Sequence, residues 1–217
     1  MNTSFKSKHL VLISGPSAAG KTTLIEKIRD RAPELEHECF SFLFEQPFHF
    51  VRRAELFEGS IASDENLVVH YDITAIVHDS FHRVKNCDLS RLRPSDLDFN
   101  RMTKYIEGSN RVTVMVLRPS SEALMDRISL RIQVNLTDRP EGWRQRVARY
   151  EYLRSFYSSD RRLHRFYKVW ENFLKSQGIN PSSVIDSTDG FSLIQYNRTD
   201  KATQQVTACK SDSLILK

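Results

Sequence analysis

The chain has 217 residues, of which 40% are hydrophobic and 27% are charged, and its formal net charge is +5. This composition is typical of a soluble globular protein and excludes a fibrous or largely disordered chain, and the length suits one α/β domain better than two. The sequence contains no apolar run approaching the about 20 residues that span a bilayer, and the first apolar segment is too short for a signal peptide. We therefore expect a cytoplasmic protein with no membrane partner. Its three cysteines show neither zinc-site nor disulfide spacing.

Strand-like and helix-like segments alternate along the chain. Short runs rich in β-branched or aromatic residues predict five strands, at residues 10–14, 39–44, 67–73, 112–117 and 183–186. Helical patterns cover residues 22–31, 96–106, 121–130 and about 142–176, and the last is expected to break at Ser158-Ser159-Asp160. This alternation predicts an α/β fold with a parallel sheet, over a single domain at residues 1–196 followed by a loosely held polar tail at 197–217.

Residues 15–22 read Gly-Pro-Ser-Ala-Ala-Gly-Lys-Thr and match the phosphate-loop pattern Gly-x-x-x-x-Gly-Lys-[Ser/Thr], between a predicted strand and a predicted helix. The glycines let successive backbone N–H groups converge on a phosphate at the positive end of the helix. Lys21 would reach the β- and γ-phosphates, and Thr22 would ligate Mg²⁺. The alternative is a plain strand-to-helix turn. The expected nucleotide-binding residues are Gly15, Pro16, Ser17, Ala18, Ala19, Gly20, Lys21, Thr22 and Thr23.

The segment His9-Leu-Val-Leu-Ile-Ser-Gly-Pro-Ser-Ala-Ala-Gly-Lys-Thr-Thr-Leu24 resembles the N-terminus of guanylate kinases and of the wider group of P-loop nucleoside and nucleotide kinases. Arg127-Ile-Ser-Leu-Arg131 resembles the start of the mobile lid in those kinases. The resemblance implies a P-loop domain whose five-stranded, mainly parallel sheet has the order 2-3-1-4-5, with flanking helices. It also implies a candidate acceptor-binding insertion at about 34–66 and a candidate lid at about 127–149. The guanylate kinase acceptor signature is absent, since Ser41-Phe-Leu-Phe-Glu-Gln-Pro47 stands in its place.

Asp72 ends the third predicted strand and is the expected partner of the phosphate loop. An acid at that position organises Mg²⁺ or accepts a proton from the attacking hydroxyl. The alternative is that Asp72 caps the helical stretch that follows it. His70 and Tyr71 are weaker candidates for contact with the acceptor, and the loop at 187–190, after the last predicted strand, is a candidate for contact with the base.

Arg127 and Arg131 lie one helical turn apart and are the expected catalytic arginines of the lid. Fixed guanidinium groups on a closing segment stabilise the charge that develops during phosphoryl transfer. Four further arginines follow, Arg139, Arg144, Arg146 and Arg149. The alternative for each is a solvated basic helix face.

Together these features predict an ATP-dependent kinase that transfers the γ-phosphoryl group to a hydroxyl or phosphate acceptor, with Thr22 and Asp72 holding Mg²⁺. GTP is an alternative donor. The expected ligands are the nucleotide and a small-molecule acceptor, rather than nucleic acid. Three other functions stay open: a nucleoside monophosphate kinase, a nucleotide-binding or switch protein without kinase activity, and a sulfotransferase-like P-loop protein.

Overall fold

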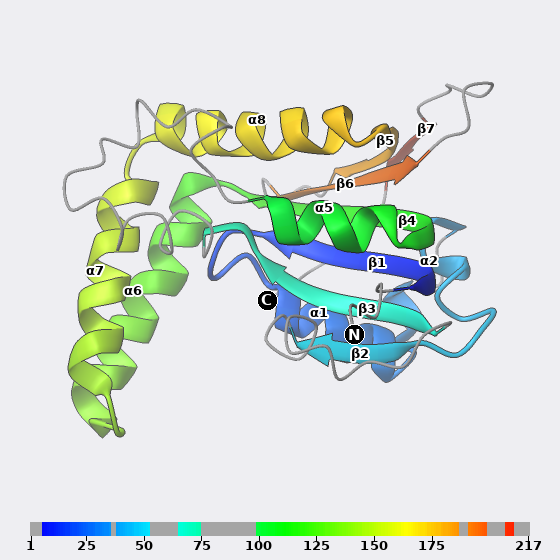
Figure 1. Cartoon of the computed structure of the whole chain (residues 1–217). Helices are drawn as coiled ribbons and strands as arrows, with labels where there is room; N and C mark the ends of the chain where they lie inside the picture. Colours follow the sequence, from blue (N-terminus) through cyan, green and yellow to red (C-terminus); the bar gives the residue numbers. More distant parts are fainter. Residues whose placement is uncertain are drawn as a thin grey trace, which may run out of the picture.

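A computed structural model of the chain describes residues 6–35, 38–52, 65–74, 99–186, 191–198 and 207–210. The strands are β1 (Ser7–Gly15), β2 (His49–Arg52), β3 (Asn66–Asp72), β4 (Ser109–Pro119), β5 (Ile179–Asp186), β6 (Phe191–Arg198) and β7 (Thr207–Lys210). The helices are α1 (Lys21–Arg29), α2 (Glu38–Ser41), α5 (Asn100–Glu107), α6 (Ser121–Asp138), α7 (Trp143–Tyr157) and α8 (Asp160–Ser176), with a 3₁₀ turn at Pro33–Leu35. The predicted α/β class is confirmed (Figure 1).

The sheet is mixed and has seven strands in the order β2-β3-β1-β4-β6-β5-β7. β2, β3, β1 and β4 run parallel to one another, whereas β6 is antiparallel to both of its neighbours, β4 and β5. The predicted five-stranded order was wrong, because β6 lies between β4 and β5. β5 and β6 are consecutive in the chain and form an antiparallel pair. In that pair β6, rather than β5, is the strand that also pairs with β4.

Two of the predicted segments differ from the structure. The run at 39–44 was predicted as a strand but includes the end of helix α2 and the turn after it, where Phe40, Phe42 and Leu43 are buried. A short apolar run is compatible with a strand or with a buried helix. Here the apolar side chains are buried without the run pairing as a strand. The edge strand β2 begins at His49 instead. The tail predicted to begin at residue 197 is also wrong in part, since β6 extends to Arg198 and β7 pairs in parallel with β5.

The predicted helix break is confirmed, because α7 ends at Tyr157 and α8 begins at Asp160. α6 begins where expected, with Ser120 accepting a hydrogen bond from the Ala123 N–H, but it continues to Asp138. α5 begins at Asn100, and residues 96–98 of the helix predicted there lie outside the described residues. In the described ranges, none of the helices has both the length and the apolar character needed to cross a membrane.

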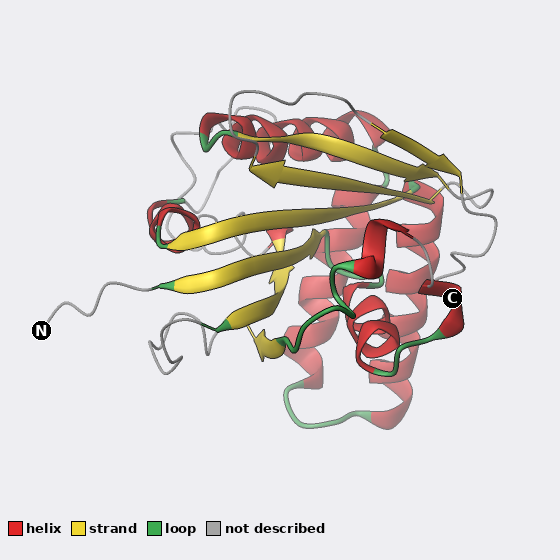
Figure 2. Cartoon of the chain, turned by 90° about the vertical axis from the view of Figure 1, so that its right-hand side faces the viewer, coloured by secondary structure: helices red, strands yellow, loops and turns green. Residues whose placement is uncertain are grey.

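Helices cover both faces of the sheet (Figure 2). Side chains alternate across a strand, so neighbouring residues of β1 enter two different cores. Leu10 and Leu12 belong to the core shared with α5, α6, α7 and α8, whereas Val11 and Ile13 pack with α1 and the segment around α2. All four are fully buried, as expected for a central strand of a parallel sheet. β1 therefore holds the loop that follows it in a rigid position.

Candidate functional site

The predicted phosphate loop joins the end of β1 to the start of α1, so the expected strand, loop and helix are all present. Gly15 has φ 152°, and a Cβ there would lie only 2.8 Å from the Leu117 carbonyl oxygen. Gly20 has φ 93° and caps α1. Residues that carry a side chain rarely adopt either backbone conformation. Both glycines of the pattern therefore stand where the backbone needs a positive φ.

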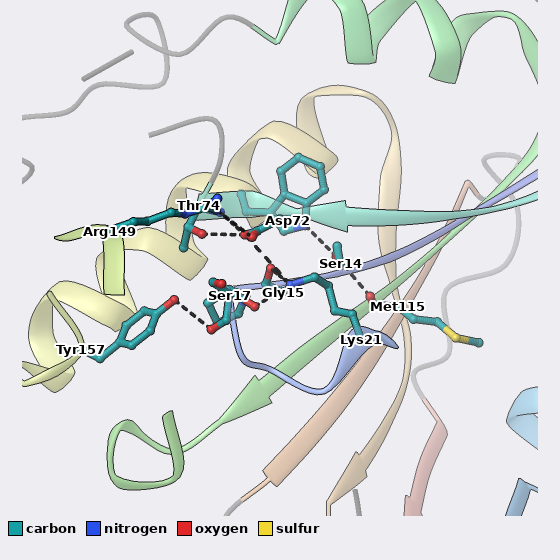
Figure 3. A network of polar contacts seen from close by, with 11 residues as sticks. Ser14, Gly15, Ser17, Lys21, Asp72, Thr74, Met115, Arg149 and Tyr157 are labelled. Carbon is teal, nitrogen blue, oxygen red and sulfur yellow. Dashed lines mark hydrogen bonds and ion pairs between the residues drawn. The ribbon is translucent and has the colours of Figure 1, made fainter. Parts of the chain in front are cut away.

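Lys21 is the first residue of α1, and only 4% of it is exposed. Its ammonium donates hydrogen bonds to the carbonyls of Gly15 at 2.9 Å and Pro16 at 2.5 Å (Figure 3). Burial lowers the pKa of Lys21 to about 8; the Asp72 carboxylate opposes this shift, and the charges of Arg131 and Arg149 add to it. The loop thus encloses a cation that water scarcely reaches.

Asp72 ends β3 and pairs in register with Gly15 on β1. Its Oδ1 lies 4.0 Å from the Lys21 Nζ and accepts hydrogen bonds from the Thr74 N–H at 2.9 Å and hydroxyl at 2.6 Å. Its Oδ2 lies 3.6 Å from Nη2 of Arg149 (Figure 3). Burial would raise the Asp72 pKa, but Lys21, the Thr74 hydrogen bonds and Arg149 together hold it below its ordinary value. The carboxylate therefore stays charged.

Both interpretations of Asp72 have a structural counterpart. The bond from the Thr74 N–H is the one a capping aspartate makes at the start of a helix. The neighbouring Lys21 and Arg149 help to keep the carboxylate charged, which the role of organising Mg²⁺ would need. The capping hydrogen bond uses Oδ1 of Asp72, and Oδ2 faces Arg149. Asp72 can therefore cap the helix and serve as the site acid at the same time.

The candidate lid is a pair of packed helices, α6 and α7, joined by the turn at residues 139–142. The pair projects from the carboxyl end of the parallel strands, with this turn farthest from the sheet (Figure 1). Arg127 on α6 donates from Nη1 to the Ala18 carbonyl at 3.2 Å, and Tyr157 on α7 donates from its hydroxyl to the Ser17 carbonyl at 3.0 Å. The base of the pair therefore contacts the phosphate loop directly.

The six lid arginines occupy different places. Arg131 is close enough for its charge to lower the pKa of Lys21 and of Arg127. Arg139 and Arg144 instead lie over the Trp143 ring near the turn, at 5.7 and 5.4 Å from its centroid. Arg131 is therefore near the loop, whereas Arg139 and Arg144 are near the turn, although all three belong to the same basic stretch of the sequence.

His70 precedes Asp72 by two residues and lies on the same face of β3. Burial lowers the pKa of His70 to about 4, and the charge of Lys21 adds to this shift. The imidazole is therefore neutral at physiological pH.

Sequence reasoning did not select Tyr157 or Thr74 as site residues, and it named Arg149 only as a further arginine of the candidate lid. Thr74 carried a local signal, since a Thr two residues after an Asp often bonds it. Tyr157 is 140 residues from its partner Ser17, and no local pattern could pair them. The loop at 187–190 lies outside the described residues, and Thr22 is exposed at the start of α1.

The chain was compared with protein-family models, with curated proteins and with solved structures, and none of the three comparisons found a match.

Proposed function

We propose that this chain is a P-loop phosphotransferase that binds Mg·ATP and transfers its γ-phosphoryl group to a small hydroxyl or phosphate acceptor. One observation carries the proposal: a loop containing two required glycines encloses a buried lysine beside a carboxylate on the adjacent parallel strand. Ligands of open α/β sheets bind at this end of the strands. A turn that only connected a strand to a helix would gain little from burying Lys21, because taking a charge out of water costs free energy even when the charge has partners.

The balance of charge at the site favours a polyanion. Lys21, Arg131 and Arg149 act on the same region, and Asp72 is the carboxylate among them. The three positive charges repel one another at close range, and a bound anion would reduce that repulsion. A triphosphate at the N-terminus of α1 supplies that anion and meets the positive end of the helix.

Each predicted residue then has a role. The backbone of residues 15–20 and the side chain of Lys21 hold the phosphates, and Thr23 lies beside them in the first turn of α1. Thr22 and Asp72 are suited to Mg²⁺, which takes few protein ligands and completes its shell with phosphate oxygens and water. When bound, the metal would neutralise charge on the phosphates. Arg131 and Arg127 would stabilise charge in the transition state.

A second candidate, a nucleotide-binding protein that transfers no phosphoryl group, rests on the contacts of Asp72. Oδ1 already accepts two hydrogen bonds from Thr74, and Arg149 faces Oδ2. A carboxylate held charged in this way is a weak proton acceptor. Asp72 is therefore better suited to organising Mg²⁺ than to acting as a general base.

The deciding experiment compares Lys21→Ala with Lys168→Ala, which removes an exposed lysine from α8. Mg·ATP should raise the melting temperature of the parent and of Lys168→Ala, but not that of Lys21→Ala, because a ligand stabilises in proportion to its binding. Equal stabilisation of all three proteins would contradict the proposal. A screen for ADP release with nucleosides, nucleotides, sugars and aminoglycosides then separates the kinase from the binding protein.

A further inference from the structure

The carbonyl groups of the phosphate loop are held from three directions. Lys21 binds those of Gly15 and Pro16, Tyr157 binds that of Ser17, and Arg127 binds that of Ala18. The first contacts lie within the loop, whereas the last two come from α7 and α6. Four consecutive carbonyls of the loop are therefore tied to side chains of the protein.

Fixing a carbonyl also fixes an N–H group, because the C=O and N–H of a trans peptide point in opposite directions. The bond from Tyr157 to the Ser17 carbonyl thus sets the direction of the Ala18 N–H. The bond from Arg127 to the Ala18 carbonyl does the same for the Ala19 N–H, which donates to the Pro16 carbonyl at 3.2 Å. The Ala18 N–H belongs to the part of the loop expected to receive phosphate, and the Ala19 N–H closes a turn within that loop.

The residue between the two held carbonyls is strained. Ala18 has φ 69°, a left-handed conformation that is unfavourable for a residue with a Cβ. Such a conformation persists when its surroundings impose it, and functional sites are where it is most often found. Here Tyr157 holds the peptide before Ala18, and Arg127 holds the peptide after it.

The Tyr157 contact is shielded from solvent. None of Tyr157 is exposed, and Ser17 is 7% exposed, so water is poorly placed to replace the hydroxyl. A buried carbonyl that loses its donor stays unsatisfied unless the backbone moves. Loss of the hydroxyl should therefore shift the loop.

We propose that Tyr157 is a positioning residue which, together with Arg127, holds the phosphate loop in its anion-receiving shape before the ligand arrives. The base of the α6–α7 pair is then a fixed support for the loop, and any closing motion of the candidate lid is confined to the part nearer the turn at 139–142. This inference rests on the proposed function for the identity of the ligand.

The test compares Tyr157→Phe with Tyr167→Phe. Tyr167 is also buried in the core that α8 shares, and its hydroxyl makes no hydrogen bond within the described part of the chain. Both variants lose one hydroxyl and keep the ring. Calorimetry should show Tyr157→Phe binding Mg·ATP and inorganic tripolyphosphate about five- to tenfold more weakly than the parent, as loss of one buried hydrogen bond implies. Because Tyr157 would act on the part of the loop that binds phosphate, affinity should fall by the same factor for Mg·ATP and for tripolyphosphate. The affinities of Tyr167→Phe should match those of the parent.

A second variant tests the strain. Glycine adopts positive φ freely, so Ala18→Gly in the Tyr157→Phe background should recover part of the lost affinity. Amide exchange at Ala18 and Ala19 in the free protein should be faster in Tyr157→Phe than in Tyr167→Phe. Arg127→Met, which removes the second contact, should weaken tripolyphosphate binding in the same direction.

The outcomes separate the two proposals. If the parent binds neither Mg·ATP nor tripolyphosphate, the proposed function fails and the inference fails with it. If the parent binds both and Tyr157→Phe binds them equally well, with unchanged amide exchange, only the positioning role of Tyr157 is overturned. A lower melting temperature with unchanged affinity also overturns it, because that is the result of a purely structural role.

Discussion

The two ends of the parallel strands carry buried polar groups of opposite character. At the amino end, His9 meets the Thr113 hydroxyl at 2.9 Å, and Thr113 donates to Asn197 at 2.8 Å. Ser7 donates to Ser109 beside them. Burial lowers the pKa of His9 to about 4, with the charge of Arg111 adding to the effect, so the buried imidazole is neutral near neutral pH. At the carboxyl end, Lys21 and Arg149 face Asp72.

Under the proposed function, this difference distinguishes polar groups that support the fold from those that would bind a ligand. The amino-end groups are neutral and bind one another across β1, β4 and β6, which suits a buried interior. The carboxyl-end groups keep an excess of positive charge, and they hold a loop with a strained Ala18. A neutral network there would cost less to bury, so the charged arrangement supports the proposed binding function.

The largest effect is expected from Asp72→Asn, which removes the negative charge of the carboxyl end and keeps the size of the side chain. Turnover should fall by a factor on the order of 10² or more, while Mg·ATP affinity changes only a few fold. Steady-state kinetics and calorimetry separate the two quantities. Thr113→Val at the amino end is the control and should leave turnover unchanged; equal losses in both variants would mean that the two ends do not differ in function.

The pH dependence of binding is the next largest effect. The pKa of Lys21 in the free protein is about 8, and a bound polyphosphate should raise it by favouring the charged form. Below pH 8 the lysine is already protonated and binding takes up little proton. Above pH 8 binding requires proton uptake, so affinity should fall, approaching about tenfold per pH unit. Calorimetry in buffers of different ionisation enthalpy measures the uptake, and a flat profile between pH 8 and 10 would argue against Lys21 as the phosphate-binding group.

Arg131→Ala should have a smaller effect. Arg131 lies near Lys21 and would act on charge that develops in the transition state, so kcat and kcat/KM should fall together by about tenfold while ATP affinity stays nearly constant. Arg144→Ala, near the turn of the α6–α7 pair, is the matched control and should behave like the parent. If the two variants lose activity equally, position along the pair does not matter and the basic helices act as one charged surface.

The smallest effect is expected at the amino end. Thr113→Val leaves His9 and Asn197 without the hydroxyl between them and should lower the free energy of unfolding by about 1–2 kcal/mol. Denaturant unfolding measures this loss, and Mg·ATP affinity should not change. A change in affinity without a loss of stability would reverse the assignment of the two ends.

Local patterns in the sequence were sufficient for the α/β class, for the strand–loop–helix unit around residues 15–22, and for the break between α7 and α8. Each of these depends on residues within a few positions of one another: glycines at φ 152° and 93° for the loop, and a Ser-Ser-Asp run for the break. Backbone preferences and helix caps act over that range. The position of Asp72 at a strand end was likewise readable, although its bond to Thr74 was not predicted.

Only the tertiary structure decided which distant segments meet. β6 pairs between β4 and β5. The apolar run at 39–44 packs in the core without forming a strand, and its sequence is equally compatible with a buried strand and a buried helix. The contact of Tyr157 with Ser17 joins residues 140 positions apart, and Arg149 reaches Asp72 from a helix that follows a different strand. Such contacts depend on the packing of whole helices against the sheet, which no local pattern encodes.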